Sequence, residues 1–200
     1  ARVSIYDSAL MFGDMVFEMT RSFNKKQFKL REHLERLYTS IRYARIPLEM
    51  TIDEMEEAVY KTIEINKHCF EDYDEDRIMI NVSRGLIPIY EGKVGTPPGP
   101  NVIIANYPLR WTIQNLSHLY DTGINLVLVP QRAIPAHLLE PKIKNRSRIH
   151  YQMANIQASL YEGKDNWAML IDPDGFIAEG TGDNIFIVKD GVVITPEGRN

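Results

Sequence analysis

Apolar residues recur along the first half of the chain with two different periods, and each period predicts one kind of element. Alternation with a period of two predicts strands over residues 2–5, 15–21, 27–30, 77–83 and 101–106. Spacings of three and four residues predict a helix over 31–44. A second helix is predicted over 51–66, because Thr51 and Glu54 have the spacing of a capping box. Residues 88–100 are rich in proline and glycine, which predicts a loop.

The second half follows a segment without a clear period, residues 107–122, and begins with a strand predicted over 124–130. Ser147 is a candidate cap for a helix that ends by Gly163. The apolar stripe predicted for this helix consists of Ile149, Met153, Ile156 and Leu160. Four short strands are predicted at 167–171, 176–178, 184–188 and 192–195. Aspartate–glycine turns at 174–175 and 190–191 connect them into a β-meander.

These patterns predict an α/β or α+β chain of two packed domains, residues 1–117 and 118–200. With 44% hydrophobic residues the chain can bury a substantial core, and its net charge of −4 favours neither nucleic acid nor an anionic membrane as a partner. The single cysteine, Cys69, excludes an internal disulfide, fits a reducing cytoplasm and is expected to be a buried filler. No apolar run is long enough to span a bilayer.

Two segments contain residues that suit covalent chemistry on an aldehyde. Lys144 follows a proline-broken stretch directly before the predicted helix, and Glu179 ends a short apolar strand 35 residues later. A lysine held by rigid backbone can act as a nucleophile. The residues alone leave simpler readings open, in which Lys144 is a solvated lysine in a basic turn and Glu179 a solvated turn residue. Arg36 would then be a helix-surface charge paired with Glu32.

Three motifs together resemble the fold-type IV (class IV) pyridoxal-phosphate-dependent aminotransferases, and most closely the branched-chain group. They are E-G-T-G-D-N at 179–184, E-H-L-E-R-L at 32–37, and Lys144 followed four residues later by Arg148. The resemblance implies that Lys144 is the catalytic residue that forms the Schiff base with pyridoxal 5′-phosphate. It also implies that Arg36 binds the cofactor phosphate, that Glu179 pairs with the pyridine nitrogen and that Arg148 lies near the phenolic oxygen.

The resemblance also implies a set of substrate-binding residues. Phe17 and Arg21 match the family's F-E-G-x-R segment, whereas Met19 departs from its glycine and would reshape the pocket. Phe12 stands where branched-chain enzymes often have tyrosine. Arg84, followed by glycine, resembles the arginine that D-amino-acid aminotransferases place near the substrate carboxylate.

The fold implied is a small N-terminal α/β sandwich followed by a cofactor domain that contains the β-meander. The family's C-terminal part is expected to be missing from these 200 residues. The activity implied is the transfer of an amino group between a branched-chain-like amino acid and a 2-oxo acid such as 2-oxoglutarate, by a cytoplasmic homodimer without a metal. The alternatives are an aminodeoxychorismate lyase, a D-amino-acid aminotransferase, or a truncated relative that acts only as a binding module.

Overall fold

The computed structural model describes residues 2–197, and they divide into two compact units. The first unit contains the residues up to Asn115 together with Lys142–Ser147. The second contains Leu116–Pro141 and the residues from Arg148 onward. The segment 142–147, which the sequence pattern assigns to the second domain, therefore packs with the first unit.

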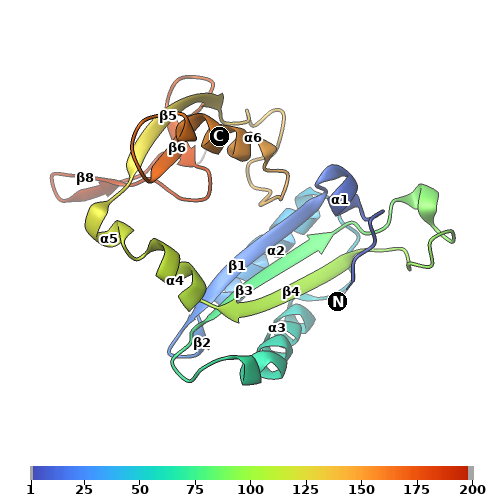
Figure 1. The fold of residues 1–200 in the computed structure, drawn as a ribbon. Helices are drawn as coiled ribbons and strands as arrows, with labels where there is room; N and C mark the ends of the chain where they lie inside the picture. Colours follow the sequence, from blue (N-terminus) through green and yellow to red (C-terminus); the bar gives the residue numbers. More distant parts are fainter. Residues whose placement is uncertain (1, 198–200) are drawn as a thin grey trace. The chain divides into compact units, whose positions relative to one another are not determined.

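The first unit is built on a four-stranded antiparallel sheet in the order β2-β1-β3-β4 (Figure 1). Its strands are β1 (Met15–Phe23), β2 (Lys26–Gln27), β3 (Asp76–Ser83) and β4 (Asn101–Pro108). Residues of β1 and β3 pair in register, so that Phe17 lies opposite Asn81 and Met19 opposite Met79. The short helix α1 (Ser8–Phe12) precedes β1, and its N-cap is Asp7, whose side chain accepts a hydrogen bond from Ala9 N.

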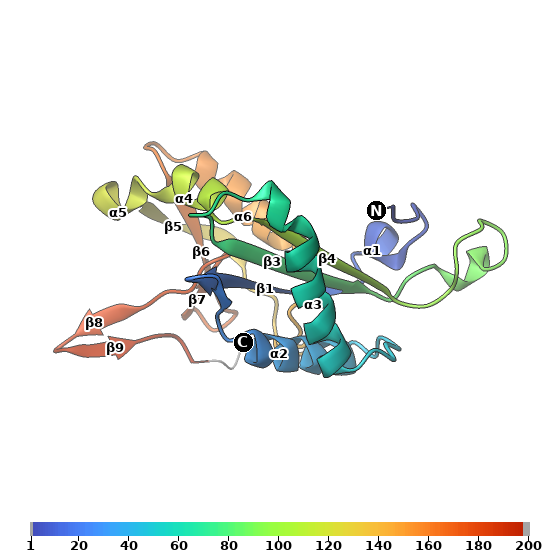
Figure 2. The same ribbon diagram turned by 90° about the horizontal axis from the view of Figure 1, so that it is seen from below.

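Helices α2 (Leu30–Tyr43) and α3 (Ile52–Asn66) cover one face of this sheet (Figures 1 and 2). The alternation of each strand directs every second side chain to that face, where these side chains meet the apolar stripes of the helices. The resulting core consists of Val16, Leu30, Leu34, Leu37, Ile41, Ile46, Met55, Val59, Ile78, Ile80 and Val82. The 3₁₀ turns η1 (Lys67–Cys69) and η2 (Pro88–Tyr90) lie in the connections that follow α3 and β3.

The segment 142–147 runs antiparallel to β1 along the edge away from β3. Asn145 forms a bridge with Val16, Phe17 N donates to Lys144 O at 2.9 Å, and Arg146 N donates to Met15 O at 2.8 Å. Alternation along this segment directs Ile143 to the helix-covered core. Lys144 and Arg146 take the other face, the face that contains Phe17.

The second unit contains a three-stranded sheet, a helix and a separate hairpin. Strands β5 (Asn125–Arg132) and β6 (Asn166–Ile171) are parallel and connected through α6 (Ile149–Ser159), and β7 (Ile177–Gly180) pairs antiparallel to β6. Strands β8 (Ile187–Lys189) and β9 (Val192–Ile194) form a hairpin of their own (Figure 2). The core of this unit consists of Val129, Ala133, Ala154, Ala158, Ala168 and Leu170.

Several predictions about local structure are wrong. Residues 2–5 form no strand. The apolar stripe predicted for α6 lies on its exposed side, with Ile149 and Leu160 78% and 80% exposed, whereas Ala154 and Ala158 are fully buried. Small side chains let α6 approach the sheet closely, and its larger apolar residues lie on the outer face. Cys69 is exposed rather than buried.

The segment that showed no clear period contains the end of β4 and two short helices, α4 (Arg110–Leu116) and α5 (Leu119–Thr122). The predicted four-stranded meander is divided, because β7 and β8 do not pair within the described chain. None of the helices found in residues 2–197 has the length and apolar character needed to cross a membrane.

Candidate active site

Lys144 is held in the first unit by backbone contacts on two sides. Its carbonyl accepts from Phe17 N in β1, and its own N–H donates to the hydroxyl of Ser40 in α2 at 3.1 Å. The Lys144 ammonium lies 5.0 Å from the centre of the Phe17 ring, which is almost completely buried. The half-buried lysine is therefore mounted on an extended segment that is fixed by both a strand and a helix.

Ser40 connects this lysine to the helix that contains Arg36. It is fully buried, and its hydroxyl donates to Arg36 O at 3.2 Å while it accepts from Lys144 N. One turn of α2 therefore separates the candidate phosphate ligand from the residue that supports the candidate nucleophile. Sequence analysis missed Ser40, because the partner of its hydroxyl is 104 residues away in the chain.

Arg146 is a second residue to which sequence analysis assigned no role. Its guanidinium lies over the Phe17 ring, 3.7 Å from the ring centre, and Nε donates to Asn81 Oδ1 at 3.0 Å. Phe17 therefore contacts two cations on one sheet face. The i, i+2 spacing of Lys144 and Arg146 in an extended segment was the available signal for this arrangement.

Arg36 does not form the surface pair with Glu32 that helix spacing allows. Nε and Nη2 of Arg36 donate to the two carboxylate oxygens of Glu18 in β1, the second at 2.9 Å. His33 Nδ1 lies 2.9 Å from the same carboxylate. Burial alone would raise the pKa of Glu18, but the hydrogen bonds from His33 and Arg36 outweigh burial and lower that pKa.

Glu179 lies at the end of β7 in the second unit and is exposed. It accepts a hydrogen bond from the hydroxyl of Tyr151 in α6. The Arg148 guanidinium lies over the Tyr151 ring, 5.0 Å from its centre. Burial raises the pKa of Tyr151, and the hydrogen bond to Glu179 raises it further. Tyr151 therefore contacts two of the predicted cofactor residues, Glu179 and Arg148.

The glycine after Glu179 has a steric reason to be glycine. A Cβ on Gly180 would lie 2.0 Å from Asp183 Oδ2, and Gly180 N donates to Asp183 O at 3.2 Å. The loop therefore folds back tightly against the end of β7. Burial and the nearby charge of Glu179 raise the pKa of Asp183, against the lowering effect of a hydrogen bond from Gly182 N.

Among the predicted substrate residues, Arg84 is engaged by the protein itself. Its guanidinium contacts both oxygens of Asp14, at 2.6 and 3.3 Å, and donates to the carbonyls of Ala44 and Arg45 at 2.8 and 2.7 Å. This network fixes the connection after α2 to the start of β1. A substrate carboxylate at Arg84 would have to compete with Asp14.

The other predicted substrate residues occupy different surroundings. Phe17 and Met19 lie on the sheet face that α2 and α3 leave uncovered. Arg21 is further along β1, where its guanidinium lies 3.9 Å from the centre of the Phe23 ring. Phe12 ends α1 and is 70% exposed.

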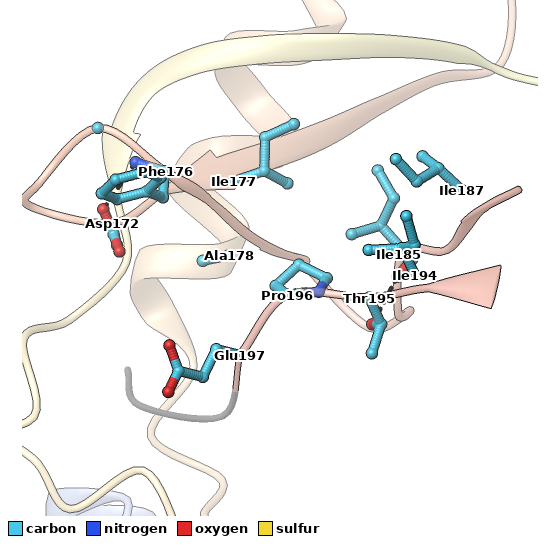
Figure 3. Close-up of a pocket in the computed structure, with 11 residues that line it drawn as sticks. Asp172, Phe176, Ile177, Ala178, Ile185, Ile187, Ile194, Thr195, Pro196 and Glu197 are labelled. Carbon is cyan, nitrogen blue, oxygen red and sulfur yellow. Dashed lines mark hydrogen bonds between the residues drawn. The ribbon is translucent and has the colours of Figure 1, made fainter. Parts of the chain in front are cut away.

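The second unit also contains a cleft of about 620 Å³, shown in Figure 3. Its walls are mainly apolar and include Phe176, Ile177, Ile185 and Ile194. None of the predicted site residues lines it. Its polar lining residues are Asp172, Thr195 and Glu197, and Asp172 Oδ1 accepts a hydrogen bond from Phe176 N at 2.8 Å. No group of three or more potential metal ligands occurs within the described residues.

Comparison with known proteins identifies the family. A family model described as amino-transferase class IV matches residues 15–200, and the chain therefore belongs to the class IV aminotransferases. This confirms the resemblance inferred from the three motifs. The α/β architecture of the family is confirmed as well, because solved branched-chain aminotransferases superimpose on the chain.

Among similar proteins is one from Methanocaldococcus jannaschii, provisionally named a branched-chain-amino-acid aminotransferase, which is 36% identical over 98% of this chain and 63% of its own. The branched-chain-amino-acid aminotransferase of Salmonella typhimurium is 30% identical over 98% of this chain and 62% of its own. A crystal structure of the Escherichia coli branched-chain aminotransferase has a TM-score of 0.82, with 27% identity, over 100% of this chain and 64% of its own. The chain thus spans less than two thirds of the length of these relatives.

Proposed function

We propose that this chain functions as a pyridoxal-phosphate-dependent aminotransferase that acts on branched-chain-like amino acids. The observation that carries the proposal is the position of Lys144. Its backbone is hydrogen-bonded to β1 and to α2, and its ammonium lies next to the buried Phe17 ring. Family membership over residues 15–200 and the names of the similar proteins support it.

The residues present fit the cofactor by the chemistry of their donor groups. An amine on a rigid backbone suits the aldehyde, and a guanidinium suits the phosphate dianion. The exposed carboxylate of Glu179 can accept a hydrogen bond from a pyridinium N–H, and it accepts one from the Tyr151 hydroxyl. When bound, pyridoxal phosphate supplies an electron sink for the carbanion formed at the substrate Cα.

Each residue has a distinct role in the proposed reaction. Lys144 would hold the cofactor covalently and would move the proton at the substrate Cα as a general acid and base. Glu179 would keep the ring nitrogen of the cofactor protonated, and Tyr151 would orient the carboxylate of Glu179. Arg36 would bind the phosphate, and Arg148 would tune the phenolic oxygen.

The substrates remain part of the proposal: a branched-chain-like amino acid and a 2-oxo acid such as 2-oxoglutarate. A crystallised relative from Thermoproteus uzoniensis is described in complex with norvaline, an unbranched aliphatic amino acid. The engagement of Arg84 by Asp14 gives little support to the alternatives that use this arginine for a substrate carboxylate. Product analysis with and without an oxo-acid acceptor separates a transferase from a lyase.

We further propose a homodimer located in the cytoplasm. The family resemblance supports the dimer, and a single cysteine in 200 residues is typical of a reducing compartment. Sedimentation at micromolar concentration tests the dimer, and an active monomer would contradict it. Cell fractionation tests the location.

Borohydride reduction of the pyridoxal-phosphate-loaded chain, followed by peptide mapping, tests the proposed function. We expect a stable pyridoxyl adduct on Lys144 that is abolished in Lys144→Ala. Lys142→Ala is the matched control, because Lys142 belongs to the same segment but its ammonium lies over Tyr43, 5.8 Å from the ring centre. An adduct on Lys142, or no adduct in a folded protein, would overturn the assignment.

A further inference from the structure

The further inference concerns the buried carboxylate of Glu18, for which the family motifs suggested no role. Glu18 lies in β1 and its side chain is 1% exposed. The partners of its carboxylate in α2 are Arg36 and His33. A carboxylate is costly to bury unless cations and hydrogen-bond donors surround it, so this arrangement constrains the groups that contact it.

The contact with Glu18 makes the two edges of the Arg36 guanidinium different from each other. The edge formed by Nε and Nη2 is held by both oxygens of Glu18, a bidentate geometry that fixes the plane of the guanidinium. Nη1 has no hydrogen-bond partner within residues 2–197, and the Arg36 side chain is 54% exposed. The Nε–Nη2 edge of the guanidinium is therefore held by the buried carboxylate of Glu18, while the Nη1 edge points away from Glu18.

A free arginine side chain has several rotatable bonds and loses much of that freedom when it binds an anion. Glu18 removes this cost in advance, because the charge pair and the buried strand hold the guanidinium in one orientation. His33 lies one turn before Arg36 on the same helix and contacts the same carboxylate, which limits the rotation of Glu18 itself.

We propose that Glu18, supported by His33, is a positioning residue that orients Arg36 toward the phosphate of the cofactor and so determines selectivity for the phosphorylated form over unphosphorylated pyridoxal. This inference rests on the proposed function, because it assumes that Arg36 binds the phosphate. Glu18 acts through Arg36 and does not touch the cofactor.

The test is a double-mutant cycle in which the affinity for the ligand is measured. Dissociation constants for pyridoxal 5′-phosphate and for pyridoxal are measured on the full chain for the parent protein, Glu18→Gln, Arg36→Ala and the double variant. We expect Arg36→Ala to weaken binding of the phosphorylated ligand by about 10- to 100-fold, the scale of a lost charge-assisted hydrogen bond. Glu18→Gln should weaken it by about 10-fold, with pyridoxal changed less than about 2-fold. In the Arg36→Ala background, Glu18→Gln should cause no further loss.

Two further variants strengthen the cycle. Glu18→Asp retains a charge that the site can bury but shortens the side chain, so it should fold and still lose phosphate selectivity. Glu35→Gln is the matched control, because Glu35 lies on α2 beside Arg36 and its side chain is 60% exposed. It should change neither affinity.

Each outcome decides between the hypotheses. Equal losses for both ligands in Glu18→Gln or Glu18→Asp, full selectivity in either variant, or additive losses in the double variant would overturn the positioning role. If Arg36→Ala itself leaves selectivity intact, the phosphate assignment of Arg36 fails and the inference fails with it. The lysine adduct is measured separately, so the proposed activity of Lys144 stands or falls on its own result.

Discussion

Gly13 connects the end of α1 to the segment that contains Lys144, and its replacement by alanine tests how firmly that segment is held. Gly13 is the C-cap of α1 with φ of +70° and ψ of 16°, in the left-handed region. Its carbonyl accepts a hydrogen bond from the Ser147 hydroxyl at 2.9 Å. A Cβ at this position would lie 2.5 Å from that hydroxyl oxygen and 3.5 Å from Ser147 Cα.

The expected cost of Gly13→Ala has two parts. An alanine in the left-handed region costs about 1–2 kcal/mol. Moving Ser147 out of contact also loses its hydrogen bond, about 1 kcal/mol for a neutral pair. We therefore expect the free energy of unfolding to fall by about 2–3 kcal/mol, which for a chain of this size lowers the melting temperature by about 4–12 °C.

Gly92→Ala is the matched control, because its φ is +68° and no atom lies within 4 Å of the position of its Cβ. It should lose only the cost of the left-handed backbone, about 1–2 kcal/mol. Urea denaturation of Gly13→Ala, Ser147→Ala and the double variant then isolates the contact. In the double variant the loss should be smaller than the sum of the single losses, because the clash at the hydroxyl is gone.

The cofactor affinity should follow the same pattern, since Ser147 ends the segment that carries Lys144. Gly13→Ala should weaken pyridoxal phosphate binding, whereas Gly92→Ala should not. Equal destabilisation by Gly13→Ala and Gly92→Ala, or strictly additive losses in the double variant, would refute the reasoning that this contact holds the segment.

Two further predictions concern titration. Burial and the hydrogen bond to Glu179 raise the pKa of Tyr151, so its phenol should be among the last to ionise in an alkaline absorbance titration. Glu179→Gln should lower that pKa. Because the pKa of Tyr151 is raised in the folded state, the associated stability is present at neutral pH and is lost as the pH rises through the folded-state pKa. The pKa of Glu18 is lowered by His33 and Arg36 against the effect of burial, so its stabilisation is present above the unfolded pKa and is lost as the pH falls through the folded one. Glu18→Gln should therefore flatten the acid side of the stability curve, and an unchanged acid dependence would contradict the ion-pair account.

Local signals in the sequence predicted elements whose determinants are close together in the chain. The capping box of α3 is an example: Thr51 accepts from Glu54 N at 3.2 Å, and Glu54 accepts from Thr51 N at 2.7 Å. The strands β1 and β3 and the helix α2 were also predicted, because a period of two or of 3.6 residues is a property of a single segment. The family motifs led to the class of enzyme for the same reason.

The partners of the site residues depended on contacts between distant segments. Helix spacing indicated Glu32 as the partner of Arg36, but in the fold Arg36 pairs with the buried carboxylate of Glu18. A buried bidentate pair is stronger and better oriented than a pair with an exposed residue one turn away. Lys144 is held by Ser40, 104 residues earlier in the chain, and no local pattern identifies that hydroxyl.

The exposed apolar stripe of α6 shows that the packing of apolar residues also depends on contacts between distant segments. Periodicity correctly identifies a helix and an apolar face, but the face that packs against a sheet depends on how closely the two can approach. Ala154 and Ala158 allow the close approach, and they are buried while Ile149 and Leu160 are exposed. The sequence by itself determined the helices α2, α3 and α6, the strands β1 and β3 and the chemical class of this protein, because these depend on neighbouring residues. Only the tertiary structure decided which side chains support Lys144 and Arg36, because burial and charge pairing arise when distant segments meet.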